Sequence, residues 1–138
     1  MSKKIILTLL AIVVIAIAGI GVLLYLDKEP KKVITIDASS NSSTIKARPS
    51  QQIVINLESN PSTGYSWQLA DSYDQAVVTK ESNTFTKNSS GAIGAPGTEV
   101  WTFKAVGKGA TTLKFSYLRS WETNTAPVQI KQFNITVN

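Results

Sequence analysis

Residues 51–69 read QQIVINLESNPSTGYSWQL and contain two alternating segments separated by a short loop. Apolar side chains occupy every second position of both segments: Ile53, Ile55 and Leu57 in the first, Tyr65, Trp67 and Leu69 in the second. This period of two is typical of β-strands that bury one face. The stretch therefore predicts a strand, a loop and a second strand.

The loop Asn60-Pro61-Ser62-Thr63-Gly64-Tyr65 is predicted to be stiff. Pro61 fixes φ and offers no N–H to a neighbouring strand, and the residue before a proline is held in extended geometry. Gly64 permits a positive φ or the close approach of another segment. Taken alone, the loop is interpreted as a tight interstrand turn.

Further strands follow from the same alternation, and they are predicted at 33–37, 44–47, 77–87, 99–106, 110–118 and 128–137. In the segment 77–87 we expect Phe85 to be the apolar anchor. Gly107-Lys108-Gly109 indicates a tight hairpin. The apolar phase of the last strand slips between Ile130 and Phe133, which predicts a bulge near Lys131–Gln132.

After residue 32 no segment shows helical periodicity, so residues 33–138 are predicted to form one all-β domain. About seven short strands separated by turns favour an immunoglobulin-like antiparallel β-sandwich. The inward-facing aromatic residues are expected to belong to its core: Trp67, Trp101, Phe103 and Phe115.

Residues 1–32 are set apart as a membrane anchor or signal segment with a juxtamembrane linker. Residues 5–26 carry no charge and would span about 33 Å as a helix, enough to cross a bilayer. Ala16-Ile17-Ala18 resembles a signal cleavage site, and cleavage there would release a secreted protein. The apolar run continues for eight residues beyond Ala18, which favours a single-pass anchor with the domain on the extracytoplasmic face.

Charge and composition exclude several kinds of function. Residues 33–138 hold nine Lys/Arg and seven Asp/Glu, a net charge of only +2, which gives no case for nucleic-acid binding. The chain has no histidine and no cysteine, so the usual zinc sites and His-assisted nucleophiles are excluded. The carboxylates of the domain form no recognisable catalytic or calcium motif. We therefore expect no enzyme, cofactor, metal or small-molecule substrate.

Three motifs in this order resemble the chagasin family of cysteine-protease inhibitors. The first is the loop Asn60–Tyr65, which matches the family's Asn-Pro-Thr/Ser-Thr-Gly-aromatic motif. The second is Gly94-Ala95-Pro96-Gly97, where the family has a Gly-x-Gly-Gly type of loop. The third is Arg119-Ser120-Trp121, where the family has Arg-Pro-Trp. The resemblance covers about Thr35 to Val137.

The resemblance implies a reversible, tight-binding inhibitor of papain-like cysteine proteases that presents three loops as a wedge across the active-site cleft. The central loop, residues 60–65, would put Ser62 and Thr63 over the catalytic cysteine. The glycine-rich loop would lie along one side of the cleft through Gly91 and residues 94–97. Arg119, Ser120 and Trp121 would lie along the other side.

Two residues depart from the family pattern. Ser120 replaces a proline and leaves the third loop freer, whereas Pro96 stiffens the second loop or blocks a backbone contact that glycine allowed. The alternative function is a membrane-tethered, immunoglobulin-like adhesion or protein-binding module without inhibitory activity. That alternative explains the fold and the exposed loops, but it does not explain why three inhibitor-type motifs occur together.

Overall fold

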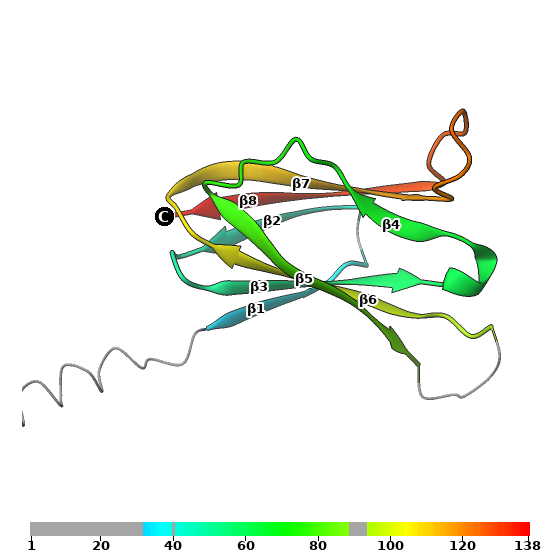
Figure 1. The fold of residues 1–138 in the computed structure, drawn as a ribbon. Coiled ribbons are helices and arrows are strands. Elements are labelled where there is room, and N and C mark those ends of the chain that lie inside the picture. Colours follow the sequence, from blue (N-terminus) through cyan, green and yellow to red (C-terminus); the bar gives the residue numbers. More distant parts are fainter. Residues whose placement is uncertain (1–31, 40, 89–93) are drawn as a thin grey trace, which may run out of the picture. The chain divides into compact units, whose positions relative to one another are not determined.

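The computed structural model describes residues 32–39, 41–88 and 94–138. Within them, eight strands form two four-stranded sheets, with the orders β1-β3-β6-β5 and β2-β8-β7-β4 (Figure 1). The strands are β1 (Val33–Asp37), β2 (Ser42–Ala47), β3 (Gln52–Ser59), β4 (Ser66–Leu69), β5 (Val78–Lys87), β6 (Gly97–Ala105), β7 (Gly109–Leu118) and β8 (Gln129–Val137). The expected all-β sandwich is confirmed, with eight strands rather than about seven.

Two of the six strand pairs are parallel, so the expectation of a purely antiparallel sandwich was wrong. β1 runs parallel to β3, and β2 runs parallel to β8. The chain passes from one sheet to the other between β1 and β2, so the two strands add to the edges of different sheets instead of forming a hairpin with each other. Each of these two edge strands runs in the same direction as the one strand that it pairs with, β3 or β8.

The core lies between the sheets and is built by the predicted alternation. Ile53, Ile55 and Leu57 of β3 are completely buried. The four aromatic residues expected in the core are also buried, and Phe115 meets the rings of Trp101, Phe103 and Phe133 edge to face, with centroids 5.1, 6.3 and 5.8 Å away. The contacts with Trp101 and Phe103 join the two sheets, whereas Phe133 lies on the neighbouring strand of the same sheet.

Two predictions about single residues or turns were wrong. Phe85 is 39% exposed, because β5 is an edge strand in which only Val78 is buried. Gly107–Gly109 does not form a hairpin, because β6 and β7 belong to different sheets. This turn is instead a corner between the sheets, where Gly107 N–H donates to the carbonyl of Val77.

The predicted bulge near Lys131–Gln132 is absent, because β7 and β8 pair in one unbroken register. Lys131 therefore faces inward with Phe133, and it is only 5% exposed. Its Nζ donates to the carbonyl oxygen of Ala38 at 2.7 Å, so the ammonium is hydrogen-bonded despite its burial. Val128 and Ile130 consequently face outward.

No helix in residues 32–39, 41–88 and 94–138 is long and apolar enough to cross a membrane. The apolar segment 5–26 and the cleavage signal near Ala18 lie outside the described residues, and so does Gly91 of the predicted second loop.

Candidate functional site

The three loops singled out from the sequence lie at one end of the sandwich (Figure 1). They connect β3 to β4, β5 to β6 and β7 to β8. Asn60 Nδ2 of the central loop donates to the carbonyl of Gly94 in the second loop at 3.0 Å. Arg119 Nε of the third loop donates to the carbonyl of Thr63 at 3.1 Å. The central loop is therefore tied to both of its neighbours.

The central loop is a closed turn rather than an extended segment. Pro61–Thr63 form one turn of 3-10 helix, in which Thr63 N–H and Oγ1 both donate to the carbonyl of Asn60, at 3.1 and 2.6 Å. Ser62 Oγ donates to the side-chain oxygen of Asn60. Gly64 ends the turn with φ +82°, which is one of the two roles that the sequence allowed for this glycine. These bonds fix the backbone that the loop presents to solvent.

The base of the central loop is held by two aromatic residues. Asn60 N–H donates to the hydroxyl of Tyr117 at 2.9 Å, and the indole N–H of Trp67 donates to the carbonyl of Glu58 at 2.9 Å. The ring of Tyr117 also packs on those of Tyr65 and Trp67, with centroids 5.4 and 4.9 Å away. The loop thus leaves the sandwich from a rigid base.

Glu99 also supports this base, and sequence reasoning missed it. Its side chain is almost fully buried. Oε1 accepts hydrogen bonds from the hydroxyl of Ser59 at 2.8 Å and from the backbone N–H of Trp67 at 3.2 Å. It therefore joins the strands on either side of the central loop. The available signal was its place two residues before Trp101 on the inward face of β6.

The third loop covers part of the central loop. Trp121 is 65% exposed, yet its ring lies so close to Gly64 that a Cβ at that position would be 2.4 Å from Cη2. The guanidinium of Arg119 lies over the ring of Tyr65, 4.5 Å from its centroid, and Nη1 pairs with Glu122 Oε1 at 3.1 Å. Glu122 is a second residue that the sequence analysis missed.

The second loop presents fewer of its predicted residues. Gly94 and Pro96 are exposed, and Ala95 is half-buried between them. Gly94 has φ +80°, a conformation that favours glycine. Gly97 is the buried first residue of β6, and a Cβ there would lie 2.4 Å from Phe85 and from the backbone of Thr86. Gly97 therefore serves the packing of β5 on β6 and offers no surface.

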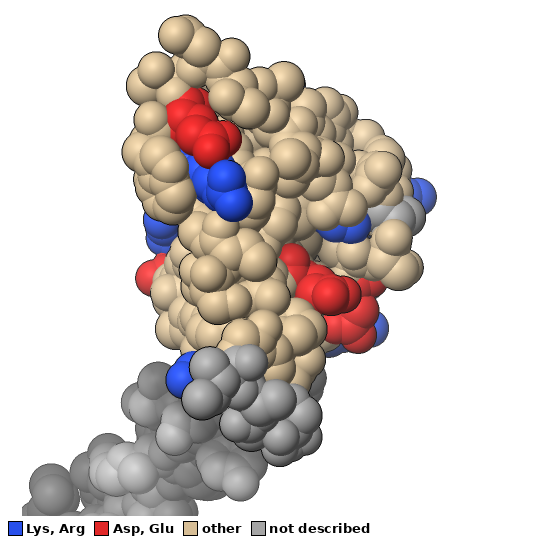
Figure 2. Space-filling view, turned by 90° about the vertical axis from the view of Figure 1, so that its right-hand side faces the viewer, with Lys and Arg blue, Asp and Glu red and all other residues tan. Residues whose placement is uncertain are grey.

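The surface at this end carries little charge. Figure 2 looks onto it and shows mostly uncharged atoms with a few charged side chains. Among the described residues, no group of three or more acidic or other metal-ligating side chains could hold a metal ion. The arrangement of these described residues is suited to covering a partner surface.

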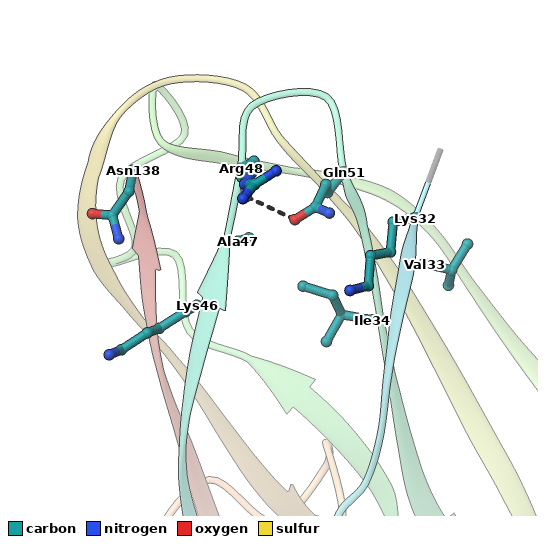
Figure 3. Close-up of a pocket in the computed structure, with 8 residues that line it drawn as sticks. All are labelled: Lys32, Val33, Ile34, Lys46, Ala47, Arg48, Gln51 and Asn138. Atoms are coloured by element: carbon teal, nitrogen blue, oxygen red, sulfur yellow. Dashed lines mark hydrogen bonds between the residues drawn. The ribbon is translucent and has the colours of Figure 1, made fainter. Parts of the chain in front are cut away.

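A hollow of about 680 Å³ lies at the opposite end of the sandwich and contains none of the predicted site residues (Figure 3). Its cationic lining residues are Lys32, Lys46 and Arg48, and the amide N–H of Arg48 donates to Gln51 Oε1 at 2.8 Å. None of the eight residues drawn in Figure 3 is acidic. The three loops and this basic hollow therefore occupy separate ends of the domain.

Comparison with known proteins connects the loops to a family. Residues 46–137 match the model described as "Chagasin family peptidase inhibitor I42". Amoebiasin-2 of Entamoeba histolytica is 29% identical over 85 residues, covering 62% of this chain and 69% of the relative. Chagasin of Trypanosoma cruzi is 32% identical over 92 residues, covering 62% of this chain and 81% of chagasin.

Solved structures agree with the fold. The crystal structure of the cysteine protease inhibitor EhICP2 from Entamoeba histolytica superposes with a TM-score of 0.69 at 25% identity, covering 77% of this chain and 96% of that one. The structure of PbICP-C in complex with falcipain-2 superposes with a TM-score of 0.52 at 21% identity, covering 78% of this chain and 99% of the other.

Proposed function

Since the chain belongs to the chagasin family of peptidase inhibitors, we propose that it is a reversible, tight-binding inhibitor of papain-like cysteine proteases. The observation that carries the proposal is the hydrogen-bonded connection of the central loop to both neighbouring loops at one end of the sandwich. Three separate loops thereby form one surface. A cleft-shaped active site is the partner that we propose for this surface.

In this proposal the central loop enters the cleft, with Ser62 and Thr63 over the catalytic cysteine. The second loop lies on one side of the cleft through Gly94–Pro96, and Trp121 lies on the other. Thr63 N–H and Oγ1 are already bonded to the carbonyl of Asn60, so the loop is held in a turn. A protease cleaves an extended segment, and a loop held in this way resists that geometry.

The affinity of such an inhibitor would come largely from preorganisation. Binding costs less conformational entropy when the contacting backbone is already fixed. The 3-10 turn, the Tyr117 hydrogen bond and the Trp121 ring beside Gly64 all restrict the central loop before a partner arrives. Exposed tryptophan is also among the residue types enriched at interface hot spots.

The direct test is titration of papain with residues 32–138. This part forms one compact unit with its own core, and the matching region makes up 96% of the EhICP2 chain, so we expect it to fold alone. Competitive inhibition at nanomolar concentration, about −12 kcal/mol of binding free energy, would support the proposal. A folded domain that does not inhibit at micromolar concentration would contradict it and favour the adhesion-module alternative.

We also propose that residues 5–26 anchor the inhibitor in a membrane with the domain on the extracytoplasmic face. β1 runs parallel to β3, so Val33 begins at the end of the sandwich opposite the three loops (Figure 1). A tether would therefore attach to the domain at the end away from the loops. The test is alkaline carbonate extraction of membranes from cells that express the full chain. Recovery of a shorter protein in the medium would instead support cleavage near Ala18.

A further inference from the structure

Three of the six exposed large apolar residues in the described part of the chain lie in the third loop or directly after it. They are Trp121, which is 65% exposed, Val128, which is 61% exposed, and Ile130, which is 40% exposed. Single exposed apolar residues are ordinary, whereas a group of them beside a binding surface indicates an interaction site. Trp121 has a role in the proposed wedge, but Val128 and Ile130 have none.

The strand register explains why Val128 and Ile130 point outward. Ile130 lies opposite Ser116 in the β7–β8 pair, and its neighbour Lys131 faces the core. Val128 lies just before β8 and lines a hollow with Leu118, which is two residues from Ser116 in β7 and therefore shares its outward face. It stays beside β7, because its N–H donates to the carbonyl of Tyr117 at 3.0 Å. Both side chains lie on the outer face of the β2-β8-β7-β4 sheet, next to the loop end.

Val128 borders the third loop directly. Val128 lines a small hollow together with Leu118, Arg119 and Glu122, and Trp121 lies between the last two in sequence. Ile130 lies opposite Ser116 of β7, which pairs with Gln68 of β4. Lys114 lies opposite Gln132, the next outward position of β8. The surface thus has an apolar centre and a polar border, as protein interfaces do.

We propose that Val128 and Ile130 extend the protease-binding surface from the third loop onto the outer face of this sheet, where they contact an apolar flank of the same protease beside its cleft. The proposal rests on the proposed inhibitory function. The added contact would let the inhibitor discriminate between proteases, because the surface beside the cleft can vary from one protease to another while the catalytic residues stay the same. Burial of these two apolar side chains against the protease would contribute favourably to the binding free energy.

The test compares two double variants of residues 32–138. Val128→Thr/Ile130→Thr makes the patch polar while keeping residues that are favourable in strands. The matched control is Val33→Thr/Val106→Thr, which changes two apolar residues that are 47% and 42% exposed elsewhere on the domain. Inhibition constants and dissociation rates are measured with papain, thermal unfolding reports folding, and light scattering reports the mass of each variant.

We expect the patch variant to raise the inhibition constant about tenfold, mainly through faster dissociation, and the control to change it less than about twofold. Equal inhibition by the two variants would overturn the proposal while leaving the inhibitory function intact. A dimeric wild-type domain that becomes monomeric only in the patch variant, with unchanged inhibition, would assign the patch to a second copy and also overturn it. A wild-type domain that does not inhibit papain would refute the proposed function itself.

Discussion

Replacement of Gly64 by alanine separates the stability of the central loop from its inhibitory role. Gly64 has φ +82°, and an alanine in this left-handed conformation costs about 1–2 kcal/mol. The new Cβ would also lie 2.4 Å from Cη2 and 2.9 Å from Cζ2 of Trp121. Because Trp121 is 65% exposed, its ring can swing away, so the overlap changes the surface more than the folding free energy.

The two consequences differ in size. A loss of about 1–2 kcal/mol lowers the melting temperature of a domain of this length by about 4–16 °C, which leaves the domain folded at 25 °C. Displacing a tryptophan hot spot costs about 2 kcal/mol or more of binding free energy. We therefore expect Gly64→Ala to raise the inhibition constant for papain about thirtyfold.

The assay is a double-mutant cycle that measures inhibition constants for the wild type, Gly64→Ala, Trp121→Ala and the combined variant. If Gly64 acts by positioning Trp121, the penalty of Gly64→Ala becomes small when the ring is already absent. Gly94→Ala is the control for backbone strain and is read in thermal unfolding alone, because Gly94 has φ +80° and, among the described residues, its Cβ would meet nothing closer than 3.8 Å. An equal penalty with and without the Trp121 ring would refute the reasoning.

Three further predictions concern hydrogen-bonding side chains of the sandwich. Tyr117→Phe removes the acceptor of Asn60 N–H and should lower the free energy of unfolding by about 1 kcal/mol in urea titrations; no change would show that the bond adds nothing. Glu99→Ala leaves the Ser59 hydroxyl and the backbone N–H of Trp67 without their acceptor and should lower the free energy of unfolding by about 2–5 kcal/mol in the same titrations. Glu99→Gln keeps an acceptor oxygen and should lower it by less. Burial lowers the pKa of Lys131, and the nearby charge of Glu58 opposes that shift. Between this lowered native pKa and the unfolded value of about 10.4, Lys131 is therefore more protonated in the unfolded chain than in the folded protein. The wild type should therefore gain stability with rising pH across this window relative to Lys131→Met, and denaturant unfolding from pH 8 to 10.5 that shows the opposite trend would contradict the shift.

The parts of the fold that the sequence predicted are those with local signals. The alternation of Ile53, Ile55 and Leu57 predicts a buried strand face because side chains on a strand have a period of two, and these residues are fully buried. A positive φ at Gly64 was one of the two roles that its place in a turn allowed, and it is observed. Both features depend on residues within one turn or one strand, so no distant partner is needed to predict them.

The features that were missed depend on partners far away in the sequence. Lys131 faces inward because its ammonium reaches the carbonyl of Ala38, 93 residues away, and Glu99 does so because it accepts from Ser59, 40 residues away. A charged residue is ordinarily assigned to the solvent face, so the sequence analysis assigned Lys131 outward and Ile130 inward. Because Phe133 also had to face inward, this assignment required a bulge between them. The parallel edge strands were missed for the same reason, since strand direction depends on a pairing across the sheet.

Arg119 shows how a motif and a structure assign different roles to one side chain. The family resemblance implies that it contacts the protease, but its guanidinium already lies on Tyr65, bonds the carbonyl of Thr63 and pairs with Glu122. A partly exposed ion pair adds little to folding stability, so its main consequence is geometric. It closes the third loop at the point where Ser120 has replaced the family's proline, and it ties that loop to the central one. A side chain with these partners acts first as a brace, and in the proposed mode of binding the exposed contact on this side falls to Trp121.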